Sequence, residues 1–162
     1  MERRRSEAAA LAALCARYGA PLIINDDVEL AAVIGAAGVH LGEHDGDLAR
    51  ARARLGNGAI IGVSCHDSLE RARELAAAGA DYLAFGAFFV SPTKPQARRA
   101  ASGLLDAAAA LGKPLVAIGG ITPDNARPLI EAGADFVAAI SGVFGDANPE
   151  AAARRYANLF HD

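Results

Sequence analysis

Six short, unbroken apolar runs alternate with segments of helical periodicity along this chain, and the alternation limits the fold more than any other feature. Unbroken apolarity is typical of strands that are buried on both faces, as in a parallel sheet covered by helices. The sequence therefore predicts an α/β fold. The runs are PLIIN (21–25), GVHLG (38–42), AIIGVS (59–64), YLAFGAFF (82–89), PLVAIGG (114–120) and FVAAIS (136–141).

The segments between these runs are rich in Ala, Leu and Arg and predict crossover helices, for example over 67–80, 100–112 and 123–134. A further helix is expected over 6–20, with Ser6 as its N-terminal cap. Three joints before strands are nearly the same, GAAGVHL, GADYLAF and GADFVAA. In each, a glycine can end a helix in the left-handed conformation. The chain is thus expected to repeat one strand and helix unit.

Such repeats form either an open doubly wound sheet or a closed (β/α)₈ barrel of the TIM type. Six units over 162 residues average about 27 residues each, and eight such units need more than about 200. The interpretation is a single domain over 1–162, a TIM-type barrel that is incomplete and has about six units. In both folds, functional residues lie in the loops after the strands.

Composition restricts the ligands. The chain has 16 basic and 19 acidic side chains and a formal charge of −3, which gives no basic surface for nucleic acid or an anionic membrane. A small anionic ligand remains open. No signal peptide or membrane span is visible, so a cytoplasmic protein is expected. Cys15 and Cys65 lack CxxC spacing and are expected to be reduced and structural.

The loops after the first strands carry carboxylates. Asp26 in NDD and Asp45 in EHD follow neighbouring predicted strands, and two carboxylates that leave room for water suit Mg²⁺. Asp27 and Asp47 are expected to cap the helices that follow. Zinc bound by His40 or His44 is the competing interpretation, but four nitrogen or sulfur ligands are not evident and His40 lies within a strand.

The later loops carry small residues and a lysine. AIGGIT and AISG place glycines and a serine where the last strands of a barrel end, and backbone N–H groups there can hold phosphate. Glycines also serve simply to turn the chain tightly. In SPTKP, Lys94 is framed by two prolines and two hydroxyls, and it either binds phosphate oxygens or is a solvated loop lysine.

Several motifs in a fixed order resemble the thiamine phosphate synthase family, from about Pro21 onward. They are IINDDVELAAVIGAAGVHLGEHD, IGVSCH, GADYLAFGAFFVSPTKP, VAIGGITPDN and GADFVAAIS. The resemblance implies a TIM-type barrel that joins hydroxymethylpyrimidine diphosphate to a thiazole phosphate and releases diphosphate with Mg²⁺. It also implies that the first two barrel strands are absent, because the family's Gln-x-Arg-x-Lys motif has no counterpart here.

The resemblance assigns roles to individual residues. Ser64 and Lys94 are the candidate catalytic residues, and with Asn25 they match contacts to the pyrimidine diphosphate. Mg²⁺ is implied at Asp26 and Asp45. The positions that match contacts to the thiazole phosphate are Ser91, Pro92, Thr93, Gly120, Ile140 and Ser141.

Other interpretations stay open at this point. A thiazole tautomerase shares the barrel but has no need of a Mg²⁺–diphosphate site. A third reading is a chain that binds the thiazole phosphate without turnover, and a sugar-phosphate epimerase is a more distant one. The partners expected are small-molecule substrates, with no nucleic acid and no membrane, and a homo-oligomer remains open.

Overall fold

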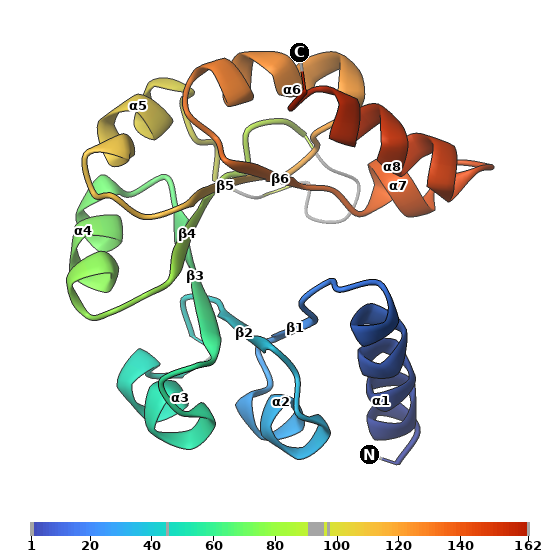
Figure 1. The fold of residues 1–162 in the computed structure, drawn as a ribbon. Helices are drawn as coiled ribbons and strands as arrows, with labels where there is room; N and C mark the ends of the chain where they lie inside the picture. The colour runs from blue at the N-terminus through green and yellow to red at the C-terminus, as the bar shows by residue number, and fades with distance from the viewer. Residues whose placement is uncertain (1, 45, 91–95, 97, 162) are drawn as a thin grey trace. The chain divides into compact units, whose positions relative to one another are not determined.

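The computed structural model describes residues 2–44, 46–90, 96 and 98–161, and strands alternate with helices along the chain (Figure 1). The chain divides into two compact units, Met1–Ser64 with Ala77–Asp81, and Cys65–Ala76 with Tyr82–Asp162. Strand β3 runs from the first unit into the second. None of the helices in the described part of the chain is long and apolar enough to cross a membrane.

The first unit contains three parallel strands in chain order, with Ile24 beside Val39 and Val39 beside Ile61. Gly38 begins β2 so close to the Ile60 carbonyl that a Cβ there would overlap it, which explains the glycine at this joint. The elements are α1 (Glu2–Arg17), β1 (Ile23–Asn25), α2 (Val28–Ile34), β2 (Gly38–Leu41), α3 (Leu48–Leu55) and β3 (Ile60–His66).

The second unit repeats the pattern with β4, β5 and β6, again parallel and in chain order. Its core is made by Leu83, Phe85, Leu105 and Leu115, each at most 1% exposed. The elements are α4 (Leu69–Ala77), β4 (Tyr82–Phe85), α5 (Gly103–Ala109), β5 (Leu115–Ile118), α6 (Pro123–Glu131), β6 (Phe136–Ala138), α7 (Ser141–Phe144) and α8 (Pro149–Asn158).

The aspartates of the two GAD joints, residues 79–81 and 133–135, bind the backbone at the start of a strand. Asp81 accepts a hydrogen bond from the Ile61 N–H at 2.7 Å, and its own N–H donates to the Ile61 carbonyl at 2.8 Å. In the same way, the Asp135 carboxylate accepts from the Leu115 N–H at 2.8 Å, and the Asp135 N–H donates to the Leu115 carbonyl at 2.9 Å. Each aspartate therefore satisfies both backbone groups at the start of the preceding strand. The motif fixes each strand start.

All six predicted strands and the three predicted crossover helices are present, with different ends. β4 stops at Phe85 rather than at residue 89, and Gly86 follows with φ of +153°. β3 continues through Cys65 to His66. The prediction that Ser6 caps the first helix is wrong, because α1 already begins at Glu2 and includes Ser6 in its second turn.

Candidate functional site

The acidic loop (25–27) follows β1 and presents two exposed polar side chains. Asp26 has a left-handed backbone, with φ of +66°, which aspartate tolerates better than most residues. The Asp26 N–H donates to the His40 carbonyl at 2.8 Å, so β2 holds this conformation. The Asn25 amide donates to an Asp26 carboxylate oxygen at 2.6 Å. Asp26, a predicted Mg²⁺ ligand, is therefore hydrogen-bonded to Asn25, a predicted contact to the pyrimidine diphosphate.

The neighbouring carboxylates have the capping roles that the sequence predicted. Asp27 accepts from the Leu30 N–H at 2.9 Å and also pairs with Arg4 at 3.2 Å. Asp47 accepts from the Arg50 N–H at 3.0 Å. Both satisfy N–H groups at the start of a helix, α2 and α3 respectively. Of the two carboxylates in the acidic loop, Asp27 thus caps a helix, whereas Asp26 does not and is exposed.

Ser64 lies near the end of β3 and is only 8% exposed. Its hydroxyl is hydrogen-bonded to Nε2 of His40, at 2.9 Å, from the neighbouring strand β2. The prediction that His40 lies within a strand is confirmed, but its bond to Ser64 was missed. The bond follows from the register, which sets His40 beside Gly62, two residues before Ser64 on the same face.

Cys65, next in β3, is fully buried, and burial raises the pKa of its thiol to about 12. A thiol so held is neutral near pH 7 and is not a nucleophile. Cys15 lies partly exposed in α1 and is also a free thiol. The structure thus agrees with the expectation that both cysteines are reduced.

The glycine loop (119–122) follows β5. Gly119 and Gly120 have φ of +94° and +64°, and a Cβ at either position would overlap the chain at Ala87 or at the Val90 carbonyl. The Asn125 side chain stabilises the loop by two hydrogen bonds. Its Nδ2 donates to the Gly120 carbonyl at 3.1 Å, and its Oδ1 accepts from the Thr122 N–H at 2.8 Å. The glycines are therefore required by the shape of this loop.

The serine loop (140–142) follows β6. Ile140 precedes α7, and its carbonyl accepts from the N–H groups of Val143 and Phe144 at 3.1 and 2.8 Å. The N–H groups of Ser141 and Gly142 come before the first bond of this turn, so they have no acceptor within it. Backbone donors at this position can meet an anion.

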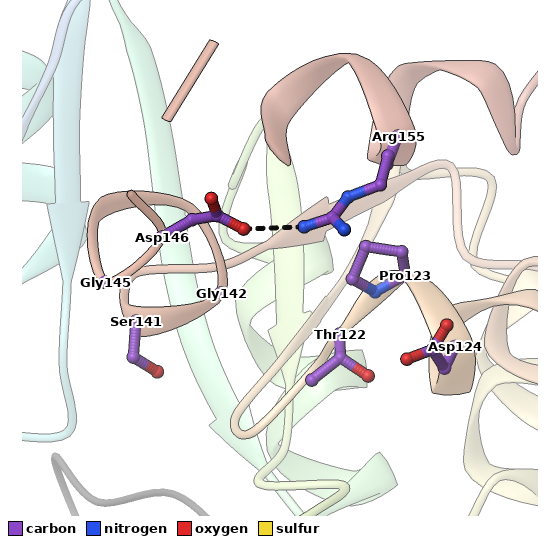
Figure 2. Close-up of a pocket in the computed structure, with 8 residues that line it drawn as sticks. All are labelled: Thr122, Pro123, Asp124, Ser141, Gly142, Gly145, Asp146 and Arg155. Carbon is purple, nitrogen blue, oxygen red and sulfur yellow. Dashed lines mark hydrogen bonds and ion pairs between the residues drawn. The ribbon is translucent and has the colours of Figure 1, made fainter. Parts of the chain in front are cut away.

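A pocket of about 270 Å³ adjoins both of these loops (Figure 2). Asp124 and Asp146 contribute two carboxylates, while Arg155 supplies one guanidinium, which is bonded to Asp146 at 2.8 Å. This balance does not favour a phosphate inside the pocket. The backbone N–H groups of the two loops, rather than the side chains of the pocket, are the candidate donors to an anion. The lining residues are Thr122, Pro123, Asp124, Ser141, Gly142, Gly145, Asp146 and Arg155.

Five predicted site residues lie outside the residues that the structure describes: Asp45, Ser91, Pro92, Thr93 and Lys94. Within the described ranges, no group of three or more His, Cys, Asp or Glu side chains could hold a metal ion. Zinc therefore finds no ligand set there. Asp26 fits one ligand of a Mg²⁺ ion, which takes hard oxygen donors and keeps several waters.

Parallel β/α repeats, with polar side chains and glycines in the loops after the strands, define an α/β protein of the barrel type. The family described as thiamine monophosphate synthase matches residues 1–143. Thiamine-phosphate synthase of Xanthomonas campestris pv. campestris (strain 8004) is 60% identical over 153 residues, 94% of this chain and 74% of the relative. The chain belongs to the thiamine monophosphate synthase family.

Two further likenesses support this. Thiamine-phosphate synthase of Thioalkalivibrio sulfidiphilus is 56% identical over 161 residues, 99% of this chain and 76% of the relative. The solved structure of thiamine phosphate pyrophosphorylase from Pyrococcus furiosus matches with a TM-score of 0.89 and 34% identity, over 99% of this chain and 77% of that one. The predicted α/β class, with about six units of a TIM-type barrel, is confirmed.

Proposed function

We propose that this chain carries out the thiamine phosphate synthase reaction, joining hydroxymethylpyrimidine diphosphate to a thiazole phosphate. Curated relatives that are named thiamine-phosphate synthase share 52–60% of its residues. The observation that carries the proposal is the acidic loop, where Asn25 and Asp26 are bonded to each other and exposed at the end of β1. A protein that bound only the thiazole phosphate would have no need of this carboxylate.

The two substrates are assigned to different residues. Asn25, Ser64 and Lys94 would contact the pyrimidine diphosphate, with Asp26 and Asp45 as the Mg²⁺ ligands. The thiazole phosphate would be bound by Gly120, Ile140 and Ser141, together with the segment Ser91–Thr93. Support for the second group comes from the described loops, because the glycine and serine loops present backbone N–H groups and are shaped by glycines.

The reaction exchanges one bond for another. The bond between the pyrimidine methylene carbon and the diphosphate oxygen breaks, and the diphosphate leaves with the bonding electron pair. The thiazole nitrogen then donates its lone pair to the methylene carbon, so no general base is required. Bound Mg²⁺ would supply positive charge to the departing diphosphate. The Lys94 ammonium would add a second positive charge there.

Ser64 would act through its hydroxyl, whose orientation is fixed by His40 at 2.9 Å. Ser64 is buried, and a hydrogen bond to a neighbouring strand helps to hold a buried hydroxyl in one orientation towards a substrate. His40 is therefore assigned a positioning role and Ser64 a contact to the pyrimidine.

The test replaces each carboxylate of the acidic loop by an amide. Asp26→Asn keeps a residue that tolerates the left-handed backbone and removes the charge. The matched control, Asp27→Asn, removes the same charge one residue away, and asparagine caps a helix as well as aspartate does. Product formation is followed by chromatography with both substrates and a Mg²⁺ titration, and thiazole phosphate binding by calorimetry.

We expect Asp26→Asn to lower turnover by on the order of 100-fold and to weaken the Mg²⁺ dependence, with thiazole phosphate binding unchanged. Asp27→Asn should retain most of the activity. Equal losses in the two variants would contradict the role of Asp26. Thiazole phosphate binding without turnover in the unaltered chain would favour a binding protein or a tautomerase instead.

A further inference from the structure

Tyr156 on the helix α8 is buried and touches both late loops. Its side chain is 6% exposed, and its hydroxyl donates to the carbonyl of Ile121, in the glycine loop, at 2.8 Å. This bond joins residues 35 positions apart in the sequence. Burial raises the pKa of the Tyr156 phenol, so the hydroxyl stays protonated and remains a donor.

The same hydroxyl also lies against the serine loop. A Cβ added at Gly142 would overlap the Tyr156 hydroxyl oxygen and would come within 3.0 Å of the Ile121 carbonyl oxygen. The absence of a side chain at position 142 therefore lets three groups meet: the phenol, the carbonyl of the glycine loop and the backbone of the serine loop. The Tyr156 hydroxyl oxygen thus lies against both loops.

Two carbonyls of the glycine loop accept hydrogen bonds from protein side chains. The Asn125 amide donates to the Gly120 carbonyl at 3.1 Å, and the Tyr156 hydroxyl donates to the next carbonyl, that of Ile121, at 2.8 Å. A carbonyl oxygen turned towards a phosphate would repel it, whereas an N–H group attracts it. Fixing both carbonyls on protein donors is what a backbone anion site in this loop requires.

Arg155, next to Tyr156 in α8, forms an ion pair. Arg155 pairs with Asp146 at 2.8 Å, which ties α8 to the segment after α7. This pair anchors the helix from the exposed side, while Tyr156 reaches the loops from the buried side. The two contacts are separable by mutation because they involve different side chains and different loops.

We propose that Tyr156 is a positioning residue for the thiazole phosphate, acting by holding the glycine loop and the serine loop at the spacing that the phosphate needs. The inference rests on the proposed function for its ligand. It adds Tyr156 of α8 to the residues that shape the site, and gives Gly142 a specific reason to be glycine.

The first test is Tyr156→Phe, with Tyr18→Phe as the control at a tyrosine that is 73% exposed. Removing the hydroxyl frees the Ile121 carbonyl and should weaken thiazole phosphate binding by about 5- to 10-fold, the effect of one buried hydrogen bond. The KM for the pyrimidine diphosphate and kcat at saturating thiazole phosphate should stay unchanged. Inorganic phosphate serves as a second probe, and its binding should weaken by a similar factor in Tyr156→Phe.

The second test uses the overlap at Gly142. Gly142→Ala should weaken binding strongly, because its Cβ meets the Tyr156 oxygen. In the double variant Gly142→Ala with Tyr156→Phe, that oxygen is gone, so binding should partly recover relative to Gly142→Ala alone. If Tyr156 only stabilised α8, the two losses would add. A double variant that binds no better than Gly142→Ala would overturn the proposal.

Backbone amide chemical shifts separate this inference from the proposed function. In the ligand-free Tyr156→Phe variant, the amide signals of Gly120 and Ser141 should move, and those of the acidic loop should not. Movement of these signals in a chain that fails to bind thiazole phosphate would refute the proposed function and keep the positioning of the loops. Unmoved signals, in a chain that binds and turns over normally, would refute the role of Tyr156.

Discussion

The two units of this chain are built from the same β/α repeat but differ in the side chains that hold their loops and strand starts in place. In the first unit charged side chains do so: the exposed Asp26 in the acidic loop, and the pair of Arg52 and Asp81, 2.6 Å apart. In the second, the neutral side chains of Asn125 and Tyr156 hold the glycine loop by hydrogen bonds to its backbone. Asp135 has no basic partner among the described side chains.

This difference suits the chemistry of the two proposed substrates. A leaving diphosphate gains charge during the reaction, and a positive charge placed beside it, such as a Mg²⁺ ion held by carboxylates, would stabilise that gain. A phosphate that does not react needs only a fixed set of donors, which a rigid backbone loop provides at little entropic cost. Charge is therefore expected to dominate mutations in the first unit, and backbone shape those in the second.

The largest effect in the second unit is expected for Gly120→Ala. The added methyl would overlap the Val90 carbonyl oxygen, so the loop must shift. Displacement of a binding group by about 1 Å can cost on the order of 100-fold. We expect a loss of thiazole phosphate binding of that size, measured by calorimetry.

Gly112→Ala is the matched control for this variant. Gly112 has nearly the same φ, +62° against +64°, but nothing lies within 4 Å of a Cβ there. The control therefore carries the same backbone strain, about 1–2 kcal/mol, without the overlap. Equal binding losses in both variants would mean that strain, and not the shape of the glycine loop, governs the effect.

Local signals in the sequence predicted much of this structure. The strands follow from unbroken apolar runs, and the caps at Asp27 and Asp47 follow from an aspartate directly before a helical segment. Asn25 and Asp26 could be placed at the end of β1 because polar residues end that run. Each of these features is decided by residues within a few positions of one another.

What the sequence could not provide are contacts between distant residues. The bonds His40–Ser64, Arg52–Asp81 and Tyr156–Ile121 join residues 24, 29 and 35 positions apart. Each depends on strand register or helix packing, which a one-residue shift would change. The end of β4 was missed for a different reason: hydrophobicity continues to residue 89, but the strand ends at Phe85.

The two GAD aspartates give a smaller test of the same contrast. Asp81 binds both the Ile61 N–H and Arg52, and Arg52 is 21% exposed. Asp81→Asn removes the charge partner of a half-buried guanidinium and should cost about 1–2 kcal/mol of unfolding free energy, after allowance for solvent screening. Asp135 has no such basic partner among the described side chains, and Asp135→Asn can keep the hydrogen bond from the Leu115 N–H, so it should cost about 0.5 kcal/mol.

Denaturant unfolding and amide exchange measure this pair of variants. Exchange at the Ile61 amide should accelerate in Asp81→Asn more than exchange at the Leu115 amide does in Asp135→Asn. High salt should narrow the difference in stability, because it screens the Arg52–Asp81 pair. A larger cost for Asp135→Asn would reverse the contrast between charged and neutral contacts.

Cys65, the first residue of the second unit, is neutral and fully buried, and its burial makes the stability of the chain depend on pH. Burial raises the pKa of this thiol from 9.0 to about 12, although Arg71 lowers it in part. Below about pH 9 the thiol is protonated in both the folded and the unfolded chain, so it contributes no pH dependence. Between pH 9 and 12 the unfolded thiol ionises first, and stability falls.

At pH 10 the loss should be about 1.4 kcal/mol relative to pH 8. The measurement compares Cys15→Ala with Cys15→Ala/Cys65→Ala, so that Cys65 is the sole thiol in the first chain and other alkaline titrations cancel. In the first chain, thiol reagents at pH 8 should label Cys65 slowly until denaturant is added. Equal pH dependence in both chains, or rapid labelling of the folded one, would show that β3 opens at Cys65 and that the second unit does not keep this group dry.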